Sequence, residues 1–178
     1  VPDVVDAMLA TGARIGEVLA LRWEDVDLAG EVPTVTISGT VVRVAGQGMT
    51  IQDHPKSSAG RRRLKIPAFL VEVLLRRQVE QLESTAFNVV FPSAVGTLRD
   101  PTNFRDQWRQ ARDRLGMTWV VPHTFRKSVA TVLAYAEDSR TAAGQLGHAG
   151  TSVTERHYVA RTHEGPDARE HLEAFGQE

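Results

Sequence analysis

The chain has 178 residues, of which 42% are hydrophobic and 24% charged, proportions typical of one ordinary globular domain. It has no cysteine, which excludes disulfide frameworks, thiolate zinc sites and cysteine nucleophiles, and no apolar stretch long enough to cross a bilayer. The formal net charge of -1 argues mildly against nucleic-acid binding, because such domains are usually basic.

The acidity is concentrated at the end of the chain. Residues 164–178 hold five acidic residues and one basic residue, so residues 1–163 carry 20 basic and 17 acidic residues, a net charge of +3. Basic residues gather in two runs, which are Lys56, Arg61, Arg62, Arg63 and Lys65, and then Arg105, Arg109, Arg112 and Arg114. Each run is compatible with a solvated face or with contact to DNA phosphates.

The start of the chain shows no signal segment, so we expect a cytoplasmic protein. The sequence opens on Val1 and enters a helical pattern almost at once. We therefore expect this chain to be part of a longer protein, with an N-terminal neighbour that precedes it.

The hydrophobic spacing predicts helices first, then strands, then helices again. Apolar residues between positions 4 and 19 predict two short helices that break near Thr11 and Gly12. From 34 to 66 the pattern changes to β-branched runs between glycines, which predicts strands at 34–37, 41–44 and 63–66. Further helices are expected after Pro67, at 104–115, 125–136, 139–146, 152–160 and 167–175. The predicted fold class is α+β, mostly helical, with a small antiparallel sheet inserted after the first helices.

Two polar features in the first half of the chain are candidates for function. Arg14 and Glu17 lie three residues apart on one side of a predicted helix, where an intrahelical ion pair is the simpler interpretation. Lys56 lies in the turn-rich segment 54–61 between two strand patterns, where a lysine is usually exposed to solvent.

His123 and Arg126 fall in the first turn of the most regular predicted helix, which follows Pro122. Backbone N–H groups at a helix start favour anions, and a guanidinium matches two phosphate oxygens, so these residues form a credible phosphate site. Capping of the helix and packing against it explain the same residues equally well.

The chain has two tyrosines, which differ in their surroundings. Tyr135 lies within an apolar helical pattern and is expected in the core, whereas Tyr158 lies among polar residues. Tyr158 follows the Leu146-Gly147-His148 sequence, in which the glycine is expected to end a short helix. A half-buried ring with a hydrated hydroxyl is the commoner state of such a tyrosine.

The order of these features resembles the tyrosine recombinases, also called the phage integrase family. The resemblance runs from Thr11 to Tyr158 and comprises an arginine with a glutamate three residues later, a lysine in a hairpin, His-x-x-Arg, Leu-Gly-His and a tyrosine. The amino-acid sequences of residues 11–23 and of Leu146-Gly147-His148 are also typical of that family.

The resemblance implies a site-specific DNA recombinase whose catalytic domain is this chain. It implies that Arg14 and Arg126 clamp the scissile phosphate, assisted by His123 and His148. Two fixed guanidiniums would stabilise the charge that develops on the non-bridging oxygens without a metal ion, so no cofactor is expected. The sequence also lacks a His-Glu-x-x-His motif and a Walker lysine loop.

By the same resemblance Tyr158 is the nucleophile, and a 3′-phosphotyrosyl intermediate would form. Lys56 would be the general acid that protonates the departing 5′ oxygen, with Lys65 as the rival. Glu17 is expected to orient Arg14 or another member of the site. Arg61, Arg62 and Arg63 are expected to contact DNA.

The expected partners are double-stranded DNA with specific recombination sites and further copies of the protein, as a tetramer on DNA inside a bacterial cell. Residues 164–178, with Ala168, Leu172 and Phe175 on one potential helical face, resemble the family segment that docks on a neighbouring subunit. Packing of this segment on its own domain is equally compatible with the pattern. Two other functions stay open, namely a relaxase like the type IB topoisomerases and a DNA-binding module without activity.

Overall fold

The structure is a computed structural model that describes residues 1–53, 61–81, 87–147 and 167–176. Its helices are α1 (Pro2–Thr11), α2 (Ile15–Leu19), α3 (Ala68–Glu80), α4 (Pro101–Arg114), α5 (Pro122–Ala136), α6 (Ser139–Leu146) and α7 (Arg169–Leu172). The strands are β1 (Val26–Asp27), β2 (Thr34–Ile37), β3 (Thr40–Val44), β4 (Gly48–Gln52) and β5 (Arg62–Lys65). The predicted α+β class, mostly helical with strands after the first helices, is confirmed. The helix expected at 152–160 lies outside the described residues.

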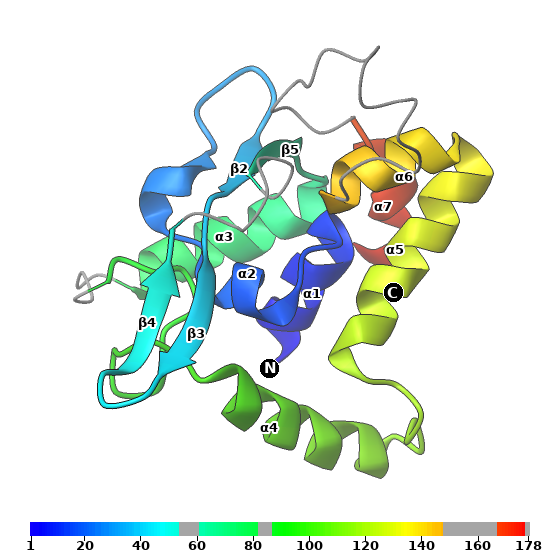
Figure 1. The fold of residues 1–178 in the computed structure, drawn as a ribbon. Coiled ribbons are helices and arrows are strands. Elements are labelled where there is room, and N and C mark those ends of the chain that lie inside the picture. Colours follow the sequence, from blue (N-terminus) through cyan, green and yellow to red (C-terminus); the bar gives the residue numbers. More distant parts are fainter. Residues whose placement is uncertain (54–60, 82–86, 148–166, 177–178) are drawn as a thin grey trace.

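Helix α1 is the centre of the molecule, with α3 on one side and α5 on the other (Figure 1). Pro2 is its first helical residue, which suits a ring that has no N–H to donate, and its buried face includes Val4 and Met8. The helix ends at Gly12, which has a left-handed conformation with φ of 65°. The break predicted near Thr11 and Gly12 is therefore confirmed, and it turns the chain directly into α2.

The strands form two separate small sheets, whereas the sequence predicts one. A three-stranded sheet has the order β1-β2-β5, and β3 pairs only with β4 in a two-stranded antiparallel hairpin. The β1 and β4 strands are missing from the prediction. Strand β1 has two residues, and β4 is at most half-buried along its length, so neither carries a strong hydrophobic alternation. The strand expected at 63–66 begins and ends one residue earlier, at 62–65.

Helix α5 is held at its start by contacts with α4 and by a side-chain cap. Near its start, the Trp108 indole N–H of α4 donates to the Val120 carbonyl at 2.8 Å, and the Trp108 ring meets the Phe125 ring edge-on. The Thr124 hydroxyl accepts the Val121 N–H at 3.0 Å and so caps the first turn. These contacts fix the turn of α5 that carries His123 and Arg126.

The end of the chain packs on its own domain in this structure. Ala168 and Leu172 are fully buried in a second core with Val129 and Leu133 of α5, and Phe175 packs against that core. After α7 the chain continues as a short 3₁₀ helix, 173–176, beside α1 and α3. The apolar face predicted for this segment is thus found, and docking on a neighbouring subunit stays a prediction. Within the described ranges, no helix combines the length and hydropathy that crossing a membrane would need.

Gly12 should tolerate no side chain. A Cβ atom there would lie 2.6 Å from Leu146 Cδ2 and 3.0 Å from Val129 Cγ1, and φ is positive, so Gly12→Ala adds both overpacking and backbone strain. We expect the free energy of unfolding to fall by about 2–4 kcal/mol, measured by urea denaturation.

Gly116 provides the matched control, because its φ of 69° is similar while a Cβ atom there would meet nothing within 4 Å. Gly116→Ala should lower the free energy of unfolding by about 1 kcal/mol, the backbone part alone. Equal losses for the two variants would contradict the close approach of α5 and α6 to Gly12.

Candidate active site

Arg14 stands at the junction of α1 and α2, where it is the N-cap residue of α2. Its backbone N–H donates to Glu17 Oε2 at 2.9 Å, and its Nη1 donates to Glu17 Oε1 at 2.9 Å. The expected pair between Arg14 and Glu17 therefore exists, but it spans the start of a helix instead of lying along one. The Arg14 side chain is 52% exposed, whereas that of Glu17 is 7% exposed. The guanidinium is thus held by a buried carboxylate and still faces solvent.

Arg126 reaches the same junction from α5. Its side chain is buried, with only 3% exposed. Its Nη1 donates to the Gly12 carbonyl at 2.7 Å, and its Nη2 donates to the Leu146 carbonyl at 2.6 Å. Burial and then the charge of Arg14 lower the pKa of Arg126 to about 10, so the guanidinium stays protonated at neutral pH. Arg126 is therefore a fixed cation that joins three segments.

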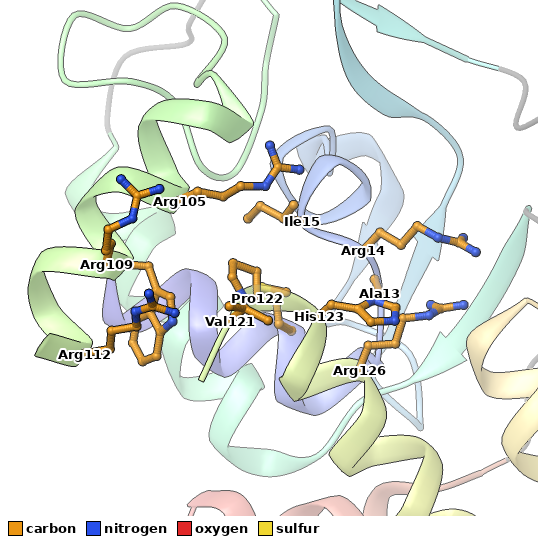
Figure 2. Close-up of a pocket in the computed structure, with 12 residues that line it drawn as sticks. Ala13, Arg14, Ile15, Arg105, Arg109, Arg112, Val121, Pro122, His123 and Arg126 are labelled. Carbon is orange, nitrogen blue, oxygen red and sulfur yellow. The ribbon is translucent and has the colours of Figure 1, made fainter. Parts of the chain in front are cut away.

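Arg14, His123 and Arg126 line one pocket, which has a volume of about 360 Å³. Figure 2 shows the two guanidiniums and the imidazole gathered at the same side of this pocket, from the α1–α2 junction and the start of α5. Ala13 and Ile15 contribute apolar lining to the same pocket. The structure thus brings together three of the predicted site residues, which are far apart in the sequence. A cationic pocket with an arginine fork is suited to a phosphate group.

Three further arginines line the pocket from α4, in the basic run for which the sequence left open a solvated face or contact with DNA phosphates. Arg105, Arg109 and Arg112 follow one another at intervals of four and three residues, so they share one face of the helix. Figure 2 shows them across the pocket from Arg14 and Arg126. Their helical spacing was the signal that distinguished them within the basic run 105–114.

The arginine run 61–63 divides between surface and interior. Arg61 and Arg63 are exposed, and Arg63 donates to Asp27 and to the Thr34 hydroxyl. Arg62 is 3% exposed and lies inside the molecule, where its Nη2 donates to Glu17 Oε2 at 3.1 Å. The prediction that Arg62 contacts DNA is therefore wrong in this structure, because its guanidinium is buried between β5 and the α1–α2 junction. DNA contact by Arg61 and Arg63 stays a prediction.

A buried polar network surrounds Arg62. Its Nε donates to the Gln145 carbonyl at 2.8 Å, and the Gln145 side-chain amide donates to the Thr11 carbonyl at 3.2 Å. Burial tends to raise the pKa of Glu17, but the charge of Arg62 and hydrogen bonds from Arg14 and Arg62 outweigh it, so the pKa lies below its ordinary value. Glu17 is therefore ionised at neutral pH. It contacts Arg14 directly, and its expected role in orienting that residue for catalysis stays a prediction.

Three predicted site residues, Lys56, His148 and Tyr158, lie outside the described residues. The described segment 87–147 ends directly before His148. Within it, α6 ends at Leu146, and Gly147 adopts a left-handed conformation with φ of 67°. The glycine end predicted for this helix is thus confirmed. Among the residues that the structure describes, no cluster of three histidine or acidic side chains could hold a metal ion.

Comparison with known proteins places the chain in a family. The family model described as "Phage integrase family" matches residues 3–164. The chain belongs to the phage integrase family. Among relatives in this family, an integrase from Streptomyces ambofaciens is 35% identical over 167 residues, which cover 84% of this chain and 42% of that protein. Tyrosine recombinase XerC from Bifidobacterium longum subsp. infantis is 28% identical over 155 residues, which cover 86% of this chain and 41% of XerC.

Solved structures of integrases and recombinases have the same fold as this phage integrase family member. The Tn1549 transposon integrase in complex with circular intermediate DNA aligns with a TM-score of 0.72 at 20% identity, over 90% of this chain and 55% of that one. The XerA recombinase aligns with a TM-score of 0.62 at 24% identity, over 89% of this chain and 53% of that one. The chain spans less than half the length of the two sequence relatives named above.

The buried pair of Glu17 and Arg62 should make stability depend on pH. A carboxyl whose pKa is lowered by folding stabilises the fold above its unfolded pKa of 4.5, and this stabilisation is lost as the pH falls through the lower, folded value. Glu17→Gln should therefore lower the free energy of unfolding by about 2–4 kcal/mol at pH 7, and by much less in acid, where the wild-type carboxyl is protonated. Urea denaturation at both pH values measures this difference.

Glu72 on α3 provides the control, because its side chain is exposed. Glu72→Gln should leave the free energy of unfolding nearly unchanged at both pH values. A loss for Glu17→Gln that is the same at pH 7 and in acid would show that the Glu17 charge does not stabilise the fold.

Proposed function

We propose that the protein to which this chain belongs is a site-specific recombinase that cuts and rejoins DNA through a covalent bond to Tyr158. The observation that carries the proposal is the meeting of Arg14 and Arg126, with His123, in one pocket. Membership of the phage integrase family and the names of its relatives as integrases and tyrosine recombinases support it.

The electrostatics of the pocket suit attack on a phosphodiester. Negative charge grows on the non-bridging oxygens as the nucleophile approaches, and donors that are already fixed in place stabilise that charge best. Arg126 meets this requirement, because two backbone carbonyls hold its guanidinium. Arg14 lies on the same side of the pocket as Arg126, and its side chain is exposed enough to reach a phosphate. Both arginines would bind the scissile phosphate.

The covalent step exchanges one phosphate ester for another. The Tyr158 hydroxyl oxygen bonds to phosphorus and passes its proton to a histidine of the site, while the bond from phosphorus to the 5′ oxygen breaks and that oxygen takes a proton from Lys56. His123 and His148 would assist this proton movement and the binding of the phosphate. Attack by a free 5′ hydroxyl reverses the step, so rejoining needs no external energy source.

The proposed substrate is double-stranded DNA, and the arginines of α4 extend the cationic surface on which it would lie. Arg105 and Arg109 line the same pocket as Arg14, and the Arg109 side chain is 60% exposed. Phosphate groups next to the scissile one would meet these side chains. Arg61 and Arg63 would add contacts from the β5 side.

Assembly of the full-length protein as a tetramer on DNA in a bacterial cell is part of the proposal. The short C-terminal segment would then dock on a neighbouring subunit. In this structure Ala168 and Leu172 of that segment pack against α5 within one chain, and docking on a neighbour would use the same apolar residues.

A covalent adduct with DNA tests the proposed function. The full-length protein, incubated with a nicked suicide substrate from its own genomic neighbourhood, should form a protein–DNA adduct that survives denaturing electrophoresis. Tyr158→Phe should form none, because the nucleophilic oxygen is absent. Relaxation of supercoils without strand exchange would favour a topoisomerase-like enzyme. Binding without any adduct would favour a DNA-binding module, and an undiminished adduct with Tyr158→Phe would contradict the role of that tyrosine.

Salt dependence tests the contact of α4 with DNA. Each phosphate contact adds about 1 to the negative slope of log K against log salt concentration. Arg109→Ala should therefore weaken binding to all DNA sequences and make the slope shallower by about 1. Arg76→Ala on α3 is the control, because that exposed arginine pairs with Asp3 and does not line the pocket. Equal slopes for both variants would contradict a contact between α4 and DNA.

A further inference from the structure

Arg62 is buried at a point where it contacts both supports of the candidate site. One support is Glu17, whose Oε2 accepts from Arg62 Nη2 at 3.1 Å while its Oε1 accepts from Arg14 Nη1 at 2.9 Å. The same Oε2 also accepts the Arg14 backbone N–H. Arg62 therefore holds the carboxylate that holds Arg14, and any shift of Glu17 would move the Arg14 guanidinium.

The other support is the end of α6. Arg62 Nε donates to the Gln145 carbonyl at 2.8 Å, and the carbonyl of the next residue, Leu146, accepts from Arg126 Nη2 at 2.6 Å. Two guanidiniums thus bind successive carbonyls of one helix end. The same helix end leads through Gly147 to His148.

Charge gives Arg62 a second effect on Arg14. Glu17 is a buried anion shared by Arg14 and Arg62, both of which donate to it. If Arg62 were neutral, the carboxylate would bind Arg14 more strongly and would compete with a phosphate for that guanidinium. With Arg62 present, part of the charge of Glu17 is already compensated from the interior, and Arg14 keeps more of its charge for the pocket.

We propose that Arg62 is a positioning residue of the active site. Through Glu17 it fixes the position of the Arg14 guanidinium and leaves more of the Arg14 charge available to a phosphate. Through the Gln145 carbonyl it holds the end of α6 to which Arg126 also bonds. Arg62 does not touch DNA in this arrangement. The inference rests on the proposed function and adds to it a residue that acts through others.

A cycle of four full-length proteins tests this role, namely the wild type, Arg62→Met, Glu17→Gln and the double variant. The measurement is the single-turnover rate of adduct formation on the suicide substrate, corrected for the folded fraction at a temperature where each protein is folded. Arg62→Met should slow adduct formation by roughly 100-fold, as expected when a catalytic group moves by about 1 Å. Adding Glu17→Gln to Arg62→Met should not slow it further and should restore part of the rate, because a neutral amide no longer competes for Arg14.

A merely structural role predicts a different result for the double variant. Two independent losses of packing would multiply, so Glu17→Gln would slow the Arg62→Met protein by the same factor as it slows the wild type. That result, or a wild-type rate for Arg62→Met, would overturn the proposal. Leu64→Val is the matched control in β5, because Leu64 is fully buried in the core and lines no part of the pocket. It should lower stability and leave the rate per folded molecule unchanged.

If Arg62→Met fails to fold, Arg62→Lys enters the same cycle. A lysine keeps the positive charge but lacks the fork that joins Glu17 to the Gln145 carbonyl, so the rate should fall less than with methionine and show the same loss of additivity. The proposed function is checked separately within the experiment. An unmodified protein that forms no adduct would contradict the recombinase activity itself, whereas an active wild type with additive variants would contradict only the role of Arg62.

Discussion

Two buried guanidiniums, those of Arg62 and Arg126, tie the α1–α2 junction to the end of α6, and the candidate site depends on this link. Arg126 bonds to the carbonyls of Gly12 and Leu146, and Arg62 bonds to Glu17 and to the Gln145 carbonyl. The proposed catalysis on a phosphate would need contacts that hold these segments to within about 1 Å. Hydrogen bonds from a rigid fork do so, because each guanidinium presents several donors in one plane.

Burial of these charges carries a free-energy cost, which the fold offsets in two ways. Backbone carbonyls and one carboxylate satisfy the donors, and apolar packing surrounds the network, with Val129 and Leu146 closing on Gly12. The left-handed glycine lets α5 and α6 approach the junction closely enough for Arg126 to reach it. The same approach positions the Gly12 carbonyl as an acceptor, so local backbone geometry and the electrostatics of the site are linked at one residue.

Hydrophobic periodicity predicts most of the fold. Motif order selects Arg14, His123 and Arg126, which the structure brings to one pocket, and Glu17, which bonds to Arg14, whereas their roles in catalysis stay predictions. The error at Arg62 comes from a strand boundary. With the strand starting at 63, Arg62 belongs to a polar loop; with β5 starting at 62, the two-residue alternation puts Arg62 on the same face as the buried Leu64. Strand β4 is not predicted because its residues are at most half-buried, so its sequence shows no clear alternation of hydrophobic and polar residues. The carbonyl acceptors at Gly12, Gln145 and Leu146 escape it because side-chain patterns carry no information about backbone partners of distant residues.

The described site carries more positive than negative charge, and the excess positive charge lies at the pocket. Three guanidiniums, of Arg14, Arg62 and Arg126, converge around one carboxylate, Glu17, which interacts with Arg14 and Arg62. Glu17 and Arg62 largely compensate each other inside the molecule. Arg14 and Arg126 then differ in how they are held, since Arg126 is fixed by backbone and Arg14 by a side chain that itself needs support. A phosphate that enters the pocket would therefore meet one rigid cation and one adjustable cation, and the adjustable one is the point at which a change in the buried network would reach the chemistry.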